Sequence, residues 1–140
     1  MSYEYVEGIT AADYAVRASG KTLGKLFESA AKGVTGIMID SKTLGGKLSA
    51  TLDGEAETVE ELLFLFLEEL LVVKDSKGVL FSSFSCVVSK DGKELHCSVR
   101  GDKIGSKGQD LLVDVKGITR HKFSLKKKKT GWEALVVLDV

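Results

Sequence analysis

The sequence predicts an α+β domain in which two helices pack on one face of a mainly antiparallel sheet. Two segments, 20–38 and 58–73, carry apolar residues at helical spacing, whereas the last third of the chain alternates as strands do. The dipeptide Asp91-Gly92 separates two further strand-like runs and is a strong hairpin signal. The 140 residues suit one domain covering 1–140, since domains typically contain about 100–150 residues.

The helix predicted over 58–73 is the most apolar segment of the chain. Apolar residues lie nearly all round its middle, so it must be covered on more than one side. Thr58 is a residue type that caps a first turn, and Glu61, three positions later, completes the pattern of a capping box. Its unbroken apolar run, 62–67, is far shorter than the ~20 residues that cross a bilayer. We therefore expect a core helix.

The other elements follow from shorter signals. Apolar alternation predicts strands, and glycine-containing polar clusters predict turns and loops. These signals predict strands over 3–7 and 15–19, a helix over 20–38, a loop over 40–46, a half-buried strand over 47–52, a turn at Asp53-Gly54 and a polar loop over 100–110.

The hairpin around Asp91-Gly92 is expected to pair residues 81–89 with 94–99, which places Cys86 opposite Cys97 and His96 across from Val87 on the outer face. Counting from a two-residue turn, the cysteine pair falls at a hydrogen-bonded position with Cα atoms ~5.5 Å apart, which permits a disulfide. The N-terminus lacks a secretory signal, so we expect a cytoplasmic protein with two reduced, buried thiols.

A second hairpin is predicted from 113–125 and 132–140. The final strand is apolar on both faces, which indicates a central position in the sheet. Basic clusters can bind phosphate backbones, but a solvated hairpin turn is the favoured interpretation of the lysines between these strands. This lysine cluster consists of Lys126, Lys127, Lys128 and Lys129.

Charge and acidic residues suggest one candidate site. Twenty basic and twenty acidic residues cancel, so net charge does not favour nucleic acid or an anionic membrane as a partner. Asp13 follows a run of small residues, and Asp139 ends an apolar strand beside the Val140 carboxylate. If the first and last strands are neighbours, these oxygens could hold Ca²⁺ or Mg²⁺. The alternatives are a capped turn with a frayed terminus, or neutralisation of the acids by Arg120 or Lys116.

Four stretches, in this order, resemble the archease family. They comprise Lys21-Thr22-Leu23 with 26–31, the helix segment 62–71, Val115-Lys116-Gly117-Ile118-Thr119-Arg120-His121, and Gly131-Trp132 with 136–140. The resemblance runs over nearly the whole chain. It departs from the family at Thr10-Ala11-Ala12-Asp13, which lacks the histidine of the His-Thr-Ala-Asp motif, at Gly117 and Arg120 in place of alanine and tyrosine, and at Phe66 in place of tryptophan.

The resemblance implies a non-catalytic function. Archeases are small α+β proteins that activate the GTP-dependent tRNA-splicing RNA ligase, promoting its guanylylation and multiple turnover. By resemblance, Asp13, Asp139 and Val140 would bind a divalent metal, and Lys116, Thr119 and His121 would contact the ligase partner. Contact with tRNA and GTP would be indirect, through the ligase, and no membrane is involved.

Two other functions stay open. A small RNA-binding module or chaperone-like modulator would use the lysine cluster and bind RNA in a salt-sensitive way without any ligase. A metal-dependent hydrolase would use the bound cation to activate water and would turn over substrate alone.

Overall fold

The computed structural model describes residues 2–6 and 14–140. Helices and strands follow one another with short connections, apart from the segment between the fifth and sixth strands. In chain order the elements are β1 (Ser2–Val6), β2 (Tyr14–Gly20), α1 (Leu23–Met38), a short 3₁₀ helix (Ser41–Thr43), β3 (Leu48–Glu55), α2 (Val59–Lys77), β4 (Val79–Val88), β5 (Glu94–Lys103), β6 (Gly117–Lys128) and β7 (Gly131–Asp139).

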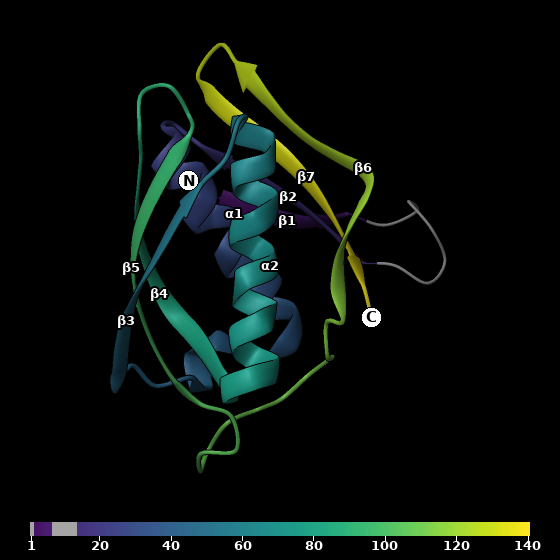
Figure 1. Cartoon of the computed structure of the whole chain (residues 1–140). Coiled ribbons are helices and arrows are strands. Elements are labelled where there is room, and N and C mark those ends of the chain that lie inside the picture. The colour runs from purple at the N-terminus through teal and green to yellow at the C-terminus, as the bar shows by residue number, and fades with distance from the viewer. Residues whose placement is uncertain (1, 7–13) are drawn as a thin grey trace.

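The strands form two antiparallel sheets. One has four strands in the order β1-β2-β7-β6, and the other has three in the order β3-β5-β4. The α+β class with two helices is confirmed, and so is the central position of β7. The prediction of one sheet is corrected to two, because no local pattern in the sequence specifies which distant strands pair. Figure 1 shows α2 between β3, β4 and β5 on one side and β6 and β7 on the other.

Helix α1 packs against both sheets, through β2 in one and β4 in the other. The side chain of Thr22 accepts a hydrogen bond from the Lys25 backbone N–H at 3.1 Å and caps the first turn, as helix N-termini require. A side chain at Gly24 would collide with the Cys86 carbonyl oxygen, so glycine lets the helix lie directly on β4. The buried Glu28 carboxylate accepts a hydrogen bond from the backbone N–H of Cys86 at 2.9 Å, which gives this edge N–H group of β4 a partner.

The strand β1 is tied to α1 by an aromatic side chain. The Tyr5 hydroxyl donates to the Gly33 carbonyl oxygen at 3.0 Å, and partial burial raises the pKa of Tyr5 to about 12. This contact closes the outer edge of the four-stranded sheet over the helix.

Helix α2 begins at its predicted cap, and it continues past the predicted end at residue 73 to Lys77. Thr58 accepts a hydrogen bond from the Glu61 backbone N–H at 3.2 Å, and Gly78 ends the helix in the left-handed conformation with φ of 64°. Its middle is buried on several faces, as predicted, and only Leu65 and Val72 among its large aliphatic residues are strongly exposed. No helix in the described ranges is long and apolar enough to cross a membrane.

The strand β3 differs from its prediction. Asp53 and Gly54 do not form a turn: they lie inside the strand, which pairs with β5 along its whole length. Every residue of β3 except Leu52 is exposed, so the predicted half-buried strand is corrected to an exposed one. The polar loop predicted over 100–110 begins only after Lys103, because β5 continues through Arg100 to pair with both neighbours.

The β4–β5 hairpin has the predicted register, with Cys86 opposite Cys97 and His96 opposite Val87. Its closing backbone bond runs from the Ser89 N–H to the Glu94 carbonyl, so the loop is longer than the two-residue turn assumed from the sequence. This change places the cysteine pair at a non-hydrogen-bonded position, where Cα atoms lie closest; their separation is 4.1 Å. The two cysteines form a disulfide, which corrects the expectation of reduced thiols.

Candidate functional site

The last residues of β7 lie between the starts of two other strands (Figure 1). Leu138 pairs with Tyr14 at the start of β2, and Asp139 pairs with Gly117 at the start of β6. The backbone N–H of Lys116 donates to the Asp139 carbonyl oxygen at 2.7 Å. Leu138 is fully buried, whereas the Asp139 side chain is exposed. The fold therefore presents a carboxylate to solvent on a backbone that is fixed on both sides.

The predicted metal ligands are Asp13, Asp139 and Val140. Asp139 and Val140 are consecutive at the end of β7, while Asp13 lies outside the described residues. Tyr14, the residue bonded to Asp13, is opposite Leu138, the residue bonded to Asp139. Within residues 2–6 and 14–140, no group of three His, Cys, Asp or Glu side chains is arranged to hold a metal ion. A cation site at this end thus depends on Asp13 and stays a prediction.

The predicted partner-binding residues follow one another along the start of β6. Lys116 is exposed just before the strand, Thr119 is half-buried within it, and His121 is exposed. The pairing of β6 with β7 is irregular between Thr119 and Ser124, where Lys122 has a left-handed φ of 56°. This bulge separates His121 from the regular ladder that holds the other two residues. Lys116 and Thr119 therefore have a fixed relation to Asp139, and His121 lies further along the same edge.

Arg120 pairs with Glu61 on α2 rather than with Asp139. Its guanidinium donates to both carboxylate oxygens of Glu61, at 2.5 and 2.9 Å, and lies 3.8 Å from the centre of the Phe64 ring. These hydrogen bonds hold the pKa of the Glu61 carboxyl below its usual value and raise that of Arg120. The Glu61 carboxylate is engaged here, so the capping box is corrected to a cap by Thr58 alone. The pair joins the bulged part of β6 to the first turn of α2.

Lys74 holds the segment just before β6 in place, a role that the sequence pattern did not reveal. It is buried near the end of α2, and its ammonium group donates to the Asp114 carboxylate and the Val115 carbonyl, both at 2.8 Å, and to Asp75 at 2.7 Å. Burial alone would lower the pKa of Lys74, but the hydrogen bonds with Asp114 and Asp75 outweigh it and raise the pKa. Lys74 thereby fixes the residue that directly precedes Lys116. A lysine within an apolar helix face was the only available signal.

The lysine cluster lies at the tip of the β6–β7 hairpin, and all four side chains are exposed. Three of them belong to β6, and Lys129 with Thr130 forms the turn. The ammonium group of Lys127 lies 5.7 Å from the centre of the Trp132 ring. This arrangement is the solvated basic hairpin that the sequence predicts.

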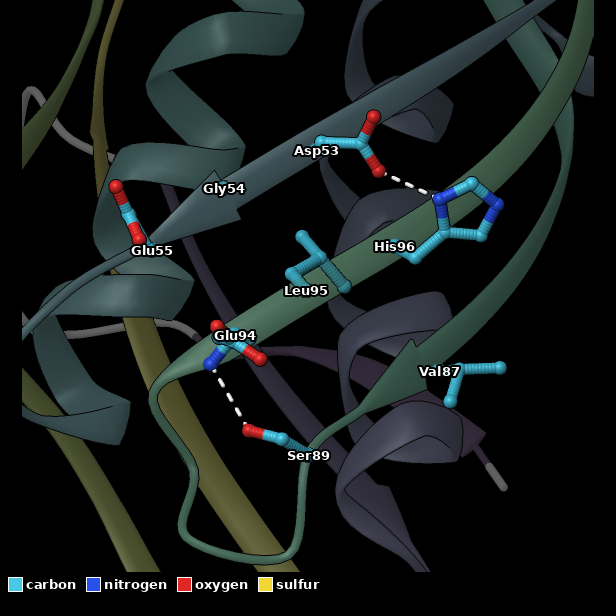
Figure 2. A pocket seen from close by; sticks show the side chains of 8 residues that line it. All are labelled: Asp53, Gly54, Glu55, Val87, Ser89, Glu94, Leu95 and His96. Carbon is cyan, nitrogen blue, oxygen red and sulfur yellow. Dashed lines mark hydrogen bonds and ion pairs between the residues drawn. The ribbon is translucent and has the colours of Figure 1, made fainter.

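A shallow concavity of about 510 Å³ lies on the outer face of the three-stranded sheet (Figure 2). Figure 2 shows the Nδ1 atom of His96 hydrogen-bonded to the Asp53 carboxylate, at 2.5 Å. The Ser89 hydroxyl, near the hairpin loop, is engaged by the Asp91 carboxylate at 2.6 Å and accepts the Glu94 N–H at 2.9 Å. The serine is thus held by its own loop and does not bond to the Asp–His pair. His96 has the outer position that was predicted.

Comparisons with known proteins identify one family. The family model described as "Archease protein family (MTH1598/TM1083)" matches residues 3–140. The protein archease of Thermococcus kodakarensis is 33% identical over 92% of this chain and 93% of its own length, and that of Archaeoglobus fulgidus is 30% identical over 100% of both.

Two solved structures share the fold. The solution structure of Methanobacterium thermoautotrophicum protein 1598 matches with a TM-score of 0.80, at 25% identity over 99% of both chains. The crystal structure of an archease from Thermotoga maritima, described as a possible chaperone, matches with a TM-score of 0.64, at 19% identity over 98% of both chains. The second of these likenesses concerns the fold alone.

Proposed function

This chain belongs to the archease family, and we propose that it is a cytoplasmic, non-catalytic protein cofactor that activates the GTP-dependent tRNA-splicing RNA ligase. The observation that carries the proposal is the family match over 3–140, which includes the end of β7 and the start of β6. The description of the Thermotoga maritima relative as a possible chaperone agrees with a role exerted on another protein.

In this proposal a divalent cation, Ca²⁺ or Mg²⁺, is held by Asp13, Asp139 and Val140. Both cations take oxygen ligands, and the exposed Asp139 carboxylate is of the required chemistry. The pairing of Tyr14 with Leu138 supports convergence, because it places the residues bonded to the two aspartates opposite each other. A bound cation would supply a fixed positive charge for carboxylate or phosphate oxygens of the partner.

The described residues around this end support a rigid contact surface. Lys74 binds the Val115 carbonyl, and the next residue, Lys116, donates its backbone N–H to Asp139. The Lys116 side chain stays exposed and is free to bind an acidic or phosphate group of the ligase. Thr119 and His121 would extend the contact along β6. Because these residues are held in place before the partner binds, less entropy is lost on association. This favours a protein cofactor that acts by docking on the ligase.

The decisive experiment is multiple-turnover RNA ligation by the partner ligase with GTP, with and without this protein. We expect turnover and ligase guanylylation to rise when the protein is added. Asp139→Ala should abolish most of the stimulation and weaken Ca²⁺ or Mg²⁺ binding measured by calorimetry. Asp110→Ala is the matched control. Asp110 is also exposed, and among the described residues only its backbone, and not its side chain, takes part in hydrogen bonds.

Two results would contradict the proposal at different levels. Unchanged ligation with the unmodified protein would remove the ligase function. Full stimulation by Asp139→Ala, with unchanged metal binding, would remove the site assignment and leave the function.

The exposed lysine cluster favours one second candidate, a small RNA-binding module or chaperone-like modulator. Four exposed lysines, one of which has its ammonium group 5.7 Å from the centre of the Trp132 ring, match the charged and aromatic character of single-strand binding surfaces. This function predicts RNA binding without the ligase, with an affinity that falls steeply with salt. Replacing Lys127 and Lys128 by glutamate should abolish that binding, whereas ligase stimulation without RNA affinity would exclude it.

A further inference from the structure

The strand β3 has one unpaired edge. It pairs with β5 alone, and the hydrogen bond from the Ala56 N–H to the Lys93 carbonyl fixes which residues face that neighbour. Since antiparallel pairs alternate, residues 48, 50, 52 and 54 bond to β5, and residues 49, 51, 53 and 55 direct their N–H and C=O groups outward. No strand in the described part of the chain pairs with these outward groups. They form a template for an added strand.

A groove of about 480 Å³ runs between this edge and α2. Its apolar lining comes from both sides, and two of its aliphatic side chains, Leu65 and Val72, are 42% and 54% exposed. A strand added to β3 would direct every second side chain toward this surface. The apolar lining consists of Leu52, Leu62, Leu65, Phe66, Val72 and Leu95.

The polar lining of the groove carries one sign of charge. Its ionisable residues are Asp53, Glu55, Glu68 and Glu69, and no lysine or arginine lines the groove among the described residues. Asp53 and Glu55 project from the outer face of β3, where they would meet the outward side chains of an added strand. A second copy of this chain would set one acidic edge against another, which is unfavourable. The charge therefore selects a basic occupant.

We propose that β3 and this groove bind an extended polypeptide segment in which apolar residues alternate with lysine or arginine. The segment would become a fourth strand of the three-stranded sheet, with main-chain bonds to residues 49–55. Its apolar side chains would cover Leu65 and Val72, and its basic side chains would pair with Asp53 and Glu55. β3 and β6 lie on opposite sides of α2 (Figure 1), so the inference is independent of the proposed site at Asp139.

The test uses the full chain and a synthetic peptide of about eight residues that alternates valine with lysine, a typical strand length. We expect saturable binding by fluorescence anisotropy. A peptide of the same sequence, N-methylated at alternate residues, should bind at least about tenfold more weakly, because it keeps the charges but loses the main-chain bonds. A valine–glutamate peptide should also bind more weakly.

Protein variants separate the edge from the charge. Thr51→Pro removes an outward N–H and no bond to β5, so we expect about a tenfold loss of affinity with unchanged circular dichroism. Glu55→Lys should weaken binding several-fold, because Glu55 is a proposed partner of the basic side chains, and Asp110→Lys, with the same change of charge outside the groove, should not. If Thr51→Pro fails to fold, the N-methylated peptide on the unmodified chain decides.

Three outcomes would overturn the proposal. Equal binding of the N-methylated peptide would indicate charge attraction alone. If the valine–lysine peptide shows no saturable binding, an extended apolar–basic segment is excluded as the partner. A dimer seen by sedimentation and lost in Thr51→Pro would assign the edge to a second copy of the chain.

Discussion

The strands β7 and β3 differ in how far they are enclosed, because one lies inside the four-stranded sheet and the other at an edge of the three-stranded sheet. In the four-stranded sheet, β7 has a neighbour on each side, and Val136 and Leu138 are fully buried. In the three-stranded sheet, β3 has one neighbour, and seven of its eight residues are exposed. The enclosed strand β7 suits a site that needs fixed ligands, and the open edge of β3 suits a surface that gains a strand. The proposed site at Asp139 and the proposed docking edge of β3 thus lie on strands of opposite character.

The largest contrast should come from one substitution made in both sheets. Leu138→Ala removes a fully buried side chain from β7 and should lower the free energy of unfolding by about 2–5 kcal/mol. Leu48→Ala, at a residue 38% exposed on β3, should cost less than about 1 kcal/mol. Urea unfolding of both variants measures the difference. Equal losses would contradict the distinction between the enclosed strand β7 and the open strand β3.

The second test concerns the disulfide, which joins β4 to β5 in the three-stranded sheet. Reduction of Cys86–Cys97 should lower the free energy of unfolding by about 2–4 kcal/mol, since the bond restricts the unfolded chain. Denaturant unfolding with and without dithiothreitol measures this effect. The Cys86→Ala/Cys97→Ala variant is the control and should not respond to the reductant. An oxidised and a reduced protein of equal stability would show that the hairpin needs no brace.

The third test concerns the contact between α2 and the segment that leads into β6 of the four-stranded sheet. Lys74→Met keeps the apolar stem but leaves the Val115 carbonyl without its ammonium donor, which should cost about 1–3 kcal/mol. Lys77→Met, at an exposed position of the same helix, should change stability by less than about 0.5 kcal/mol. Both are measured by urea unfolding. A loss confined to Lys77→Met would refute the role of Lys74.

The smallest effect is a dependence on alkaline pH. The pKa of Lys74 is raised in the folded protein, so the folded state holds this proton more tightly than the unfolded chain does. Its contribution is therefore complete below the ordinary lysine pKa and is lost as the pH rises through the raised value. The stability difference between the unmodified protein and Lys74→Met should shrink as the pH rises above the ordinary lysine pKa and through the raised pKa of Lys74. A difference that grows with pH would reverse the assigned sign.

Much of the local structure was predictable from the sequence. Thr58 marked the start of α2 because threonine caps free backbone N–H groups there. Asp91-Gly92 indicated the β4–β5 register because this dipeptide marks the centre of the hairpin loop, although the loop proved longer than two residues. The prediction that Cys86 and Cys97 form a hydrogen-bonded pair was wrong. Which pairs in the hairpin are hydrogen-bonded depends on the loop length, and the register alone does not specify that length. Asp53-Gly54 was read as a turn, but pairing with β5 overrides that local preference.

The site was predictable only in part. The sequence indicated an exposed acid at Asp139 and an exposed base at Lys116, and the structure places these two residues against each other through a backbone bond. The pairing of Arg120 with Glu61 and the burial of Lys74 escaped prediction. Both depend on contacts between residues at least 40 positions apart, for which one sequence carries no direct signal. The free edge of β3 escaped for the same reason.

The central place of β7 also has a consequence for synthesis on the ribosome. Chains emerge from the N-terminal end and begin to fold while translation continues. Both helices and the three-stranded sheet are complete once residue 103 has emerged, but β2, already paired with β1, receives its second neighbour only when 131–139 follow. Until then the nascent chain carries an unpaired β2 edge, where wrong strands can associate. A translational pause just after β6 would therefore prolong the interval in which this polypeptide is most prone to aggregate.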